Sequence, residues 1–306
     1  MKKTALTLLS LFFLLFSCNT TDDSDLPKLE EPKPEEPKSY IKTIDFSSSV
    51  SSPATINDLD VENGYLYFIH KIGIYRINLN SDANTAEFII EDDEHWPYTL
   101  KVIGNNLYYQ GLYGWTISDD IKQVDLNSIS KGVKATYPIR GTSRSQLCKN
   151  SGKLYYTSSI DAYSALNNFY EFNPSTTHQL IATGDYIVPK NLRMVGQFLY
   201  FSSFDEIRKF DLNKPSEESS IVYTVPKQEK ESKIRGFDIK DNIIYYTLES
   251  SNKLYSKDLK IVNQEPKVLG INNNKDGVGY GKLILSDKKL YVEKLTDSQL
   301  DVYGIK

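Results

Sequence analysis

A short motif recurs six times along the 306 residues of the chain, an aliphatic residue followed by Tyr and a third apolar residue. The copies are Leu66-Tyr67-Phe68, Leu107-Tyr108-Tyr109, Leu154-Tyr155-Tyr156, Leu199-Tyr200-Phe201, Ile244-Tyr245-Tyr246 and Leu290-Tyr291-Val292. The central Tyr residues are spaced by 41, 47, 45, 45 and 46 residues. Repeats of this length are typical of β-propeller blades, each of which is one four-stranded sheet.

Each copy of the motif lies in the second of four predicted strands. An apolar residue lies seven positions before the aliphatic residue of each motif, and a second apolar residue follows two positions later. Apolar residues at alternate positions are typical of a strand, so this segment is the predicted first strand. The earlier positions hold Leu59, Leu100, Leu147, Leu192, Phe237 and Leu283. The second position of each pair is also apolar, except in the third repeat, where it is Lys149. Turns rich in Gly, Asn and Ser separate the two strands, and two further strands follow each motif.

The last repeat contains only three predicted strands, because its third strand reaches Ile305 and the chain ends at Lys306. A strand-like segment at 40–46 precedes the first full repeat. Pairing it with the last blade closes the ring and removes an exposed sheet edge. We therefore predict an all-β fold, a six-bladed β-propeller over residues 40–306, with the N-terminal strand closing the last blade. We expect this domain to be a monomer.

The blade motif resembles the YWTD and related repeats of six-bladed propellers. The matching residues are Leu154-Tyr155-Tyr156-Thr157 and Ile244-Tyr245-Tyr246-Thr247. Tyr, Phe or Val stands where the family has Trp, and Ser158 and Leu248 stand where these two copies would have Asp. The resemblance covers all six repeats and implies the fold. It implies no ligand, because propellers host unrelated functions.

Residues 1–17 have the pattern of a secretory signal peptide. Two Lys residues precede an apolar run over 5–16, which is too short to span a bilayer. The run ends in Leu15-Phe16-Ser17-Cys18, which resembles the lipobox of bacterial lipoproteins. The resemblance implies cleavage before Cys18 and acylation of its thiol, so the membrane is the first expected partner.

Residues 18–39 are acidic and then rich in Pro, Glu and Lys, so we expect a disordered tether between the lipid and the propeller. Asp22 and Asp23 closely follow Cys18. This arrangement resembles the acidic export signals on surface-exposed lipoproteins of Bacteroidetes-type bacteria. It implies the outer membrane, with the cell surface favoured over the periplasmic side. An ordinary solvated linker is the alternative interpretation.

Charge and cysteine content bear on the possible partners and on disulfide formation. The formal net charge of −4 argues against a broad surface for nucleic acid, so we expect no such partner. With Cys18 lipidated, Cys148 has no second cysteine to form a disulfide. We interpret Cys148 as a small buried core residue.

The loops that join blades, and those that follow the second strand, are where propellers usually bind partners. In blades 2 and 3 these loops are rich in aromatic and cationic side chains. The candidate binding residues are His95, Trp96, Tyr113, Trp115, Arg140, Arg144 and Tyr163. Exposed aromatic rings beside Arg suit stacking on a glycan or anchoring a protein partner. The alternative is that the two Trp rings pack the loops onto neighbouring blades.

The innermost strands also carry charge toward the central channel. The candidate channel carboxylates are Asp58, Asp60 and Asp238, in the same polar phase as Lys101 and Arg193. Such carboxylates could hold a divalent cation, as in gluconolactonase-like propellers. The favoured interpretation is ion pairing between blades, for example of Arg193 with Asp238.

The sequence contains no Ser-His-Asp order, HExxH, CxxC or phosphate loop. We therefore assign no catalytic residue, no metal ligand and no cofactor. Two functions remain open. The first is a non-catalytic propeller that binds a glycan or a protein. The second is a propeller enzyme of the lactonase, lyase or hydrolase type that uses the channel carboxylates. We favour the first, because no catalytic set of residues converges.

Overall fold

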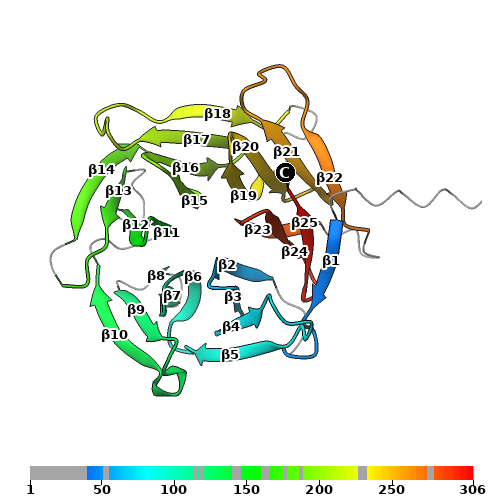
Figure 1. Cartoon of the computed structure of the whole chain (residues 1–306). Helices are drawn as coiled ribbons and strands as arrows, with labels where there is room; N and C mark the ends of the chain where they lie inside the picture. The colour runs from blue at the N-terminus through cyan, green and yellow to red at the C-terminus, as the bar shows by residue number, and fades with distance from the viewer. Residues whose placement is uncertain are drawn as a thin grey trace, which may run out of the picture. The chain divides into compact units, whose positions relative to one another are not determined.

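The computed structural model of the chain describes residues 40–50, 55–113, 116–117, 120–139, 146–159, 166–175, 178–185, 189–226, 233–273 and 279–305. These residues form six antiparallel sheets arranged as blades around a ring (Figure 1). The predicted six-bladed β-propeller is therefore confirmed. The described residues include no helix with the length and apolar character needed to cross a bilayer.

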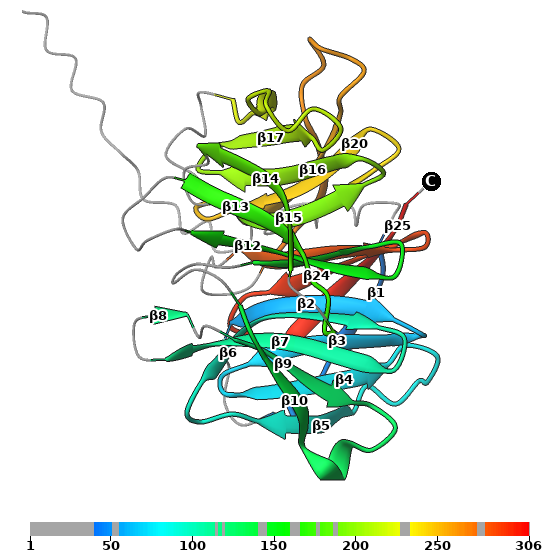
Figure 2. The ribbon, with the colours of Figure 1, turned by 90° about the vertical axis from the view of Figure 1, so that its left-hand side faces the viewer.

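Blades 1 to 3 follow one another along the chain. Blade 1 consists of β2 (Ile56–Glu62), β3 (Tyr65–His70), β4 (Gly73–Asn78) and β5 (Ala86–Glu91). Blade 2 consists of β6 (Trp96–Ile103), β7 (Asn106–Tyr113), β9 (Asp120–Asp125) and β10 (Val133–Pro138). It also contains β8 (Thr116–Ile117), which pairs with β7, and the 3-10 helix η1 (Ile129–Lys131). Blade 3 consists of β11 (Leu147–Asn150), β12 (Lys153–Ser159), β13 (Leu166–Glu171) and β14 (Gln179–Asp185). Figure 2 shows these blades from the side.

The remaining blades complete the ring. Blade 4 consists of β15 (Lys190–Val195), β16 (Phe198–Ser203), β17 (Glu206–Asp211) and β18 (Ser220–Thr224). Blade 5 consists of β19 (Ile234–Lys240), β20 (Ile243–Leu248), β21 (Lys253–Asp258) and β22 (Lys267–Ile271). Blade 6 consists of β23 (Tyr280–Ser286), β24 (Lys289–Lys294), β25 (Gln299–Gly304) and β1 (Tyr40–Asp45). The first-named strand of each blade is its innermost strand and lines the central channel (Figure 1).

Tight turns join the innermost strand of each blade to the second strand. In blade 1 the turn residues Asn63 and Gly64 have φ angles of 51° and 77°, and in blade 5 Asp241 and Asn242 have 52° and 64°. Two successive positive φ angles are those of a type I′ turn, whose twist matches that of the flanking strands. Asn, Asp and Gly tolerate this backbone better than other residues, which explains the turn composition.

Neighbouring blades pack on one another through the motif residues. Leu66, Leu107 and Leu290 are each 0% exposed. The aliphatic and aromatic residues of one blade enter a shared cluster with the next, as Tyr67 does with Leu100 of blade 2. The core is therefore distributed over the contacts between blades, and each blade is stable only between its neighbours.

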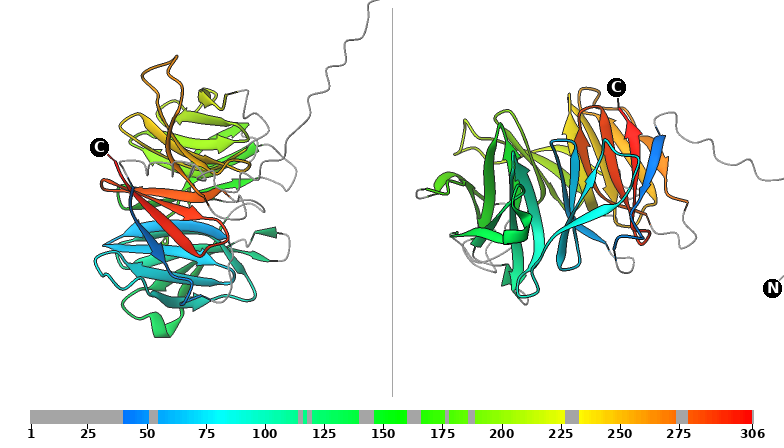
Figure 3. Two further views of the ribbon diagram at one scale, coloured as in Figure 1. Left: turned by 90° about the vertical axis from the view of Figure 1, so that its right-hand side faces the viewer. Right: turned by 60° about the horizontal axis from the view of Figure 1, so that its bottom comes forward.

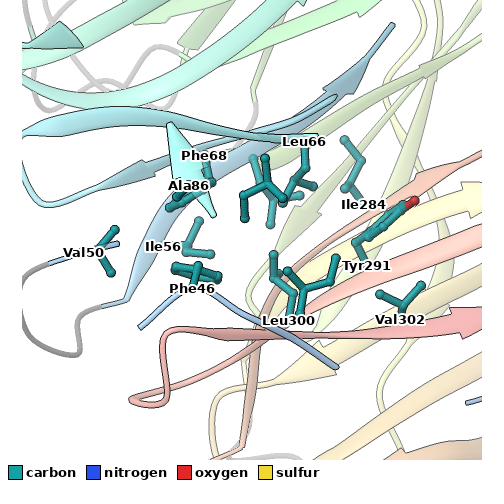
Figure 4. Close-up of a cluster of buried hydrophobic side chains, with 13 residues drawn as sticks. Phe46, Val50, Ile56, Leu66, Phe68, Ala86, Ile284, Tyr291, Leu300 and Val302 are labelled. Atoms are coloured by element: carbon teal, nitrogen blue, oxygen red, sulfur yellow. The ribbon is translucent and has the colours of Figure 1, made fainter. Parts of the chain in front are cut away.

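Blade 6 is completed by the N-terminal strand. β1 pairs with β25 in an antiparallel ladder in which Ile44 faces Leu300, and the two strands run side by side in Figures 1 and 3. The pairing confirms the predicted closure. Phe46, which follows β1, packs on Phe68 of blade 1 with ring centroids 4.8 Å apart. Figure 4 shows this cluster, which joins the last blade to the first.

Most innermost strands contain a register irregularity near their first residues, for example between Ile56 and Leu59 and between Tyr280 and Leu283. A polar side chain three positions after the motif's aliphatic residue binds the backbone there. Thr157 Oγ1 accepts the N–H of Gln146 at 3.1 Å. Thr247 Oγ1 donates to the Gly281 carbonyl at 2.6 Å. The first hydrogen bond satisfies a backbone N–H just before β11, and the second satisfies a carbonyl within the irregular part of β23.

Candidate functional site

The channel is lined by the residue that follows the buried apolar residue of each innermost strand. In chain order these residues include Asp60, Lys101, Cys148, Arg193 and Asp238, which line a small cavity of about 160 Å³. Cys148 is 1% exposed, as predicted, and burial raises the pKa of its thiol to about 12. Its thiol is therefore not a nucleophile at neutral pH.

Asp60 and Asp238 hold equivalent positions in blades 1 and 5, and they make equivalent contacts. Asp60 Oδ2 accepts the N–H of Val102 at 2.7 Å, and Asp238 Oδ2 accepts the N–H of Leu285 at 2.9 Å. Each carboxylate thus binds the backbone of the following blade. Arg193 Nε lies 3.1 Å from Asp238 Oδ2, so the predicted ion pair between blades 4 and 5 is confirmed.

Lys149, which interrupts the apolar pattern of blade 3, bridges three blades. Its Nζ lies 2.9 Å from Asp60 Oδ2 and donates to Glu62 Oε2 at 2.7 Å. It also donates to the carbonyl groups of Val61 and Val102 at 3.1 and 2.9 Å. A lysine in place of an aliphatic residue is therefore explained by the acceptors that converge from blades 1 and 2.

Asp58 lies one alternation earlier on β2 and binds blade 2. Its Oδ2 accepts from Thr99 Oγ1 at 2.9 Å, from the N–H of Leu100 at 3.0 Å and from Lys101 Nζ at 2.8 Å. Burial opposes ionisation of Asp58, but the ammonium groups of Lys101 and Lys282 outweigh it and keep its pKa below the usual value. All three predicted channel carboxylates thus accept a backbone N–H and lie beside a cation.

Glu293 of β24 and Lys282 of β23 are two further buried titratable residues, neither of which was predicted from the sequence. Glu293 is 3% exposed and accepts the N–H of Ile56 at 2.5 Å and the N–H of Lys282 at 2.8 Å. Burial raises its pKa to about 7, against the effect of these two donors. Burial also lowers the pKa of Lys282 to about 8, although Asp58 lies close enough to oppose the shift. Lys282 Nζ donates to Asn191 Oδ1 at 2.9 Å.

A sequence signal for Glu293 exists. Glu293 lies three positions after Leu290 of the motif, where four other blades carry Gln110, Thr157, Ser202 and Thr247. A polar residue is thus the rule at this buried position, and only blade 6 has a charged one. The signal was missed because a period of two identifies strands without identifying the irregular backbone that this side chain binds.

Two of the predicted binding residues lie where the chain enters β6: His95 ends the preceding loop and Trp96 is the first residue of the strand. Asp92 anchors this loop: its Oδ1 accepts the N–H of His95 at 2.9 Å, and its Oδ2 accepts from Lys122 Nζ at 2.6 Å and from Tyr109 Oη at 2.9 Å. The His95 ring lies within 3.2 Å of Lys122 Nζ. His95 is thus part of the anchor.

Trp96 directly follows this anchored loop and has 57% of its surface exposed. The loop packs closely on β7, because a Cβ on Gly111 of that strand would lie 2.3 Å from the His95 carbonyl oxygen. Trp96 therefore combines a large exposed ring with a fixed backbone. Of the other candidates, Tyr113 ends β7, while Trp115, Arg140, Arg144 and Tyr163 lie outside the described residues, as does Cys18.

Within the ranges that the structure describes, no three His, Cys, Asp or Glu side chains are grouped so as to hold a metal ion. The three channel Asp residues lie instead on two separate contacts between blades.

No family model matches the chain, and no curated protein matches its sequence. Solved structures are similar in fold. A chain of a mitotic checkpoint complex is 12% identical, with a TM-score of 0.56 over 95% of this chain and 99% of that chain. A chain of a nidogen/laminin complex is 14% identical, with a TM-score of 0.53 over 74% of this chain and 83% of that chain. At these identities the similarity shows the propeller fold alone.

Proposed function

We propose that the protein is a membrane-anchored, non-catalytic propeller that binds a glycan or a protein through the loops of blades 2 and 3. The observation that carries this proposal is Trp96, a largely exposed ring at the start of β6, directly after a loop that Asp92 holds in place. Rigid aromatic side chains that are exposed in the free protein are the residues that most often dominate binding energy. The contacts of Asp58, Asp60 and Asp238 add support, since each is already used in holding blades together.

The two similar chains named above both come from complexes, which is consistent with a propeller that serves as an interaction module. A balanced surface charge also suits recognition by aromatic and neutral polar groups rather than by long-range attraction.

The binding surface is tested by Trp96→Ala, with Trp96→Ala/Trp115→Ala as the stronger variant. We expect the affinity for a ligand found on an oligosaccharide array, or for a protein partner cross-linked to the wild-type protein in cells, to fall about thirtyfold. Phe204→Ala is the matched control, because Phe204 of blade 4 is a similarly exposed aromatic ring at 55%. The melting temperature should not change. A large drop in melting temperature, or equal binding by all variants, would contradict the proposal.

The anchor is proposed to be lipid on Cys18, followed by a tether over residues 18–39. An extended tether, at ~3.1 Å per residue, would hold the propeller several nanometres from an outer membrane surface. We expect the wild-type protein to partition into detergent and membranes, and Cys18→Ala to yield an unprocessed or soluble protein. If both proteins fractionate alike, Cys18 is not the lipidation site.

One observation favours the alternative, a propeller enzyme. Burial raises the pKa of Glu293 to about 7 and lowers that of Lys282 to about 8, and near-neutral pKa values are typical of acid–base groups. Metal analysis of the purified protein and assays on lactones and polysaccharides test this alternative. Turnover that is lost in Glu293→Gln would support it, and the absence of turnover on that panel would exclude these substrates.

A further inference from the structure

A second cavity, of about 610 Å³, lies at the closure seam, where blade 6 meets blade 1. One wall is the turn between β2 and β3 with Leu79 and Asn80, which follow β4. The other wall is the turn between β23 and β24, with Ser286, Asp287 and Tyr291. Its volume lies within the range of small-molecule sites, about 300–1,000 Å³.

Three other seams are bridged at the same level. Asn63 Nδ2 donates to the Gly104 carbonyl at 3.2 Å, and Asn150 Nδ2 donates to the Gly196 carbonyl at 3.0 Å. Lys240 Nζ donates to the Asp287 carbonyl. In each case a turn of one blade reaches the turn of the next. Between the turns of blades 6 and 1, as between those of blades 2 and 3 and of blades 4 and 5, the described residues show no such bridge. At the closure seam the cavity occupies this position.

Two polar side chains of the closure seam, Glu62 and Asn63, already bind other parts of the protein, whereas four others are available. Among the residues that the structure describes, the side chains of Asn80, Ser286, Asp287 and Tyr291 have no hydrogen-bond or ion-pair partner. The channel carboxylates contrast with them, because each of those has a cation and a backbone donor. A set of free donors and acceptors around one cavity is available to a ligand.

Gly64 helps to place one of these groups. A Cβ on Gly64 would lie 2.5 Å from Asn80 Nδ2, so the amide of Asn80 lies directly on the turn only because residue 64 is glycine. The φ of 77° at Gly64 is a second reason for glycine at this position. The absence of a side chain at residue 64 therefore leaves room for the amide at the cavity wall.

The chemistry of the cavity indicates the class of ligand. An amide offers both donors and acceptors, a carboxylate offers acceptors, and the two hydroxyl groups of Ser286 and Tyr291 offer either. Adjacent hydroxyl groups on a sugar ring need this mixture, and its C–H face can pack on Leu79 and Val61, which also line the cavity. Lys288 and Lys289 balance Glu62 and Asp287 in charge, which favours a neutral ligand.

We propose that the closure seam binds a neutral mono- or disaccharide through Asn80, Asp287 and Tyr291. This site is separate from the Trp96 surface. Trp96 begins the innermost strand of blade 2, whereas Glu62 at the seam ends that of blade 1, and the contacts of Asp58 and Asp60 show that β2 and β6 run side by side in the same direction. The two sites therefore lie at opposite ends of the channel.

The test uses the mature protein and a named panel of sugars: glucose, galactose, mannose, N-acetylglucosamine, cellobiose, lactose and diacetylchitobiose. Ligand-observed NMR detects binding, and isothermal titration measures it. We expect at least one sugar to bind the wild-type protein, and to bind Asp287→Asn and Asn80→Ala about tenfold more weakly or worse.

Asp241→Asn is the matched control. Asp241 is the corresponding turn residue of blade 5, with a φ of 52° against 54° at Asp287, and each Asp acts electrostatically on the motif Tyr of its own blade. Asn tolerates this backbone at both positions. The control should bind as the wild type does, with an unchanged melting temperature for all three variants.

The seam proposal is overturned if no sugar of the panel binds, or if the seam variants bind as well as Asp241→Asn. Loss of sugar binding in Trp96→Ala with retention in Asp287→Asn would also overturn it, and would support the blade 2 surface instead. The two proposals therefore fail independently.

Discussion

Glu293 shows how one residue can connect stability, closure and pH. Its carboxylate receives N–H groups from Ile56 of blade 1 and from Lys282 of its own blade, so it joins the two blades where the ring closes. A Cβ on Gly281 would lie 1.9 Å from Glu293 Oε2, so that residue 281 must be glycine for the carboxylate to reach the backbone. The carboxylate is thus enclosed, and burial makes its ionisation costly.

The pH dependence of stability follows from this enclosure. The pKa of Glu293 is raised from 4.5 to about 7, so the folded state holds this proton more tightly and stability falls as pH rises from about 4.5 to 7. The pKa of Lys282 is lowered from 10.5 to about 8, so stability rises again between about pH 8 and 10.5. We expect a minimum near pH 7–8 from this pair, on the order of 1 kcal/mol or more in depth.

Urea unfolding of the wild-type protein and Glu293→Gln at a series of pH values checks this expectation. The variant should be about as stable as the wild type at low pH, where the wild-type carboxyl is protonated and neutral like the amide. Its stability should fall less between pH 5 and 7, because an amide does not ionise. Equal slopes for both proteins in that interval would show that Glu293 titrates normally.

At the scale of elements, the innermost strands are joined by carboxylates that accept backbone donors of the next blade. The sequence predicted Asp60 and Asp238 in the polar phase of these strands and predicted the Arg193–Asp238 pair, because alternation specifies which side chains share a face. It did not predict that the same carboxylates bind the N–H groups of Val102 and Leu285, since such contacts depend on how two blades are staggered.

Removal of one partner of this arrangement should be costly. Asp238→Ala leaves the Arg193 guanidinium buried with two carbonyl acceptors but without its carboxylate partner, and leaves the Leu285 N–H without an acceptor. We expect a loss of about 3–5 kcal/mol in the free energy of unfolding. The double variant Arg193→Met/Asp238→Leu removes both charges and should be less destabilised than Asp238→Ala. A double-mutant cycle of Arg193→Met, Asp238→Leu and their combination, measured by chemical denaturation, gives the coupling energy, and additive effects of the two changes would contradict the coupling.

For the whole molecule, the six copies of the motif were sufficient to predict the number of blades, and the missing fourth strand of the last repeat was sufficient to predict that β1 closes the ring. The seam cavity had no counterpart in the sequence. Asn80 and Asp287 are far apart along the chain, and their juxtaposition depends on where the ring closes. Trp96 was predicted as a candidate from its repeat position, but its exposure depends on the anchor that Asp92 forms with Tyr109 and Lys122.

The pairing of β1 with the last blade predicts different effects on the melting temperature for two deletions. Removal of residues 40–47 takes away β1 and Phe46, exposes the edge of β25 and opens the cluster of Figure 4. It should lower the melting temperature of the entire ring, because closure supports every blade contact. Removal of residues 22–36, in the proposed tether, should leave the melting temperature unchanged. Equal melting temperatures for the two deletions would contradict this role of β1.

The pairing of β1 with β25 also has a consequence in time. Thr43 and its acceptor Asp301 are separated by 258 residues, so a ribosome that adds 5–20 residues per second makes the second about 10–50 s after the first. Blades 1 to 5 are translated within that interval, while the segment that becomes β1 has no sheet to join. The earliest-made strand of the propeller is therefore the last to be incorporated, and during its wait the nascent chain is vulnerable to proteases and to pairing with other chains at residues 40–46.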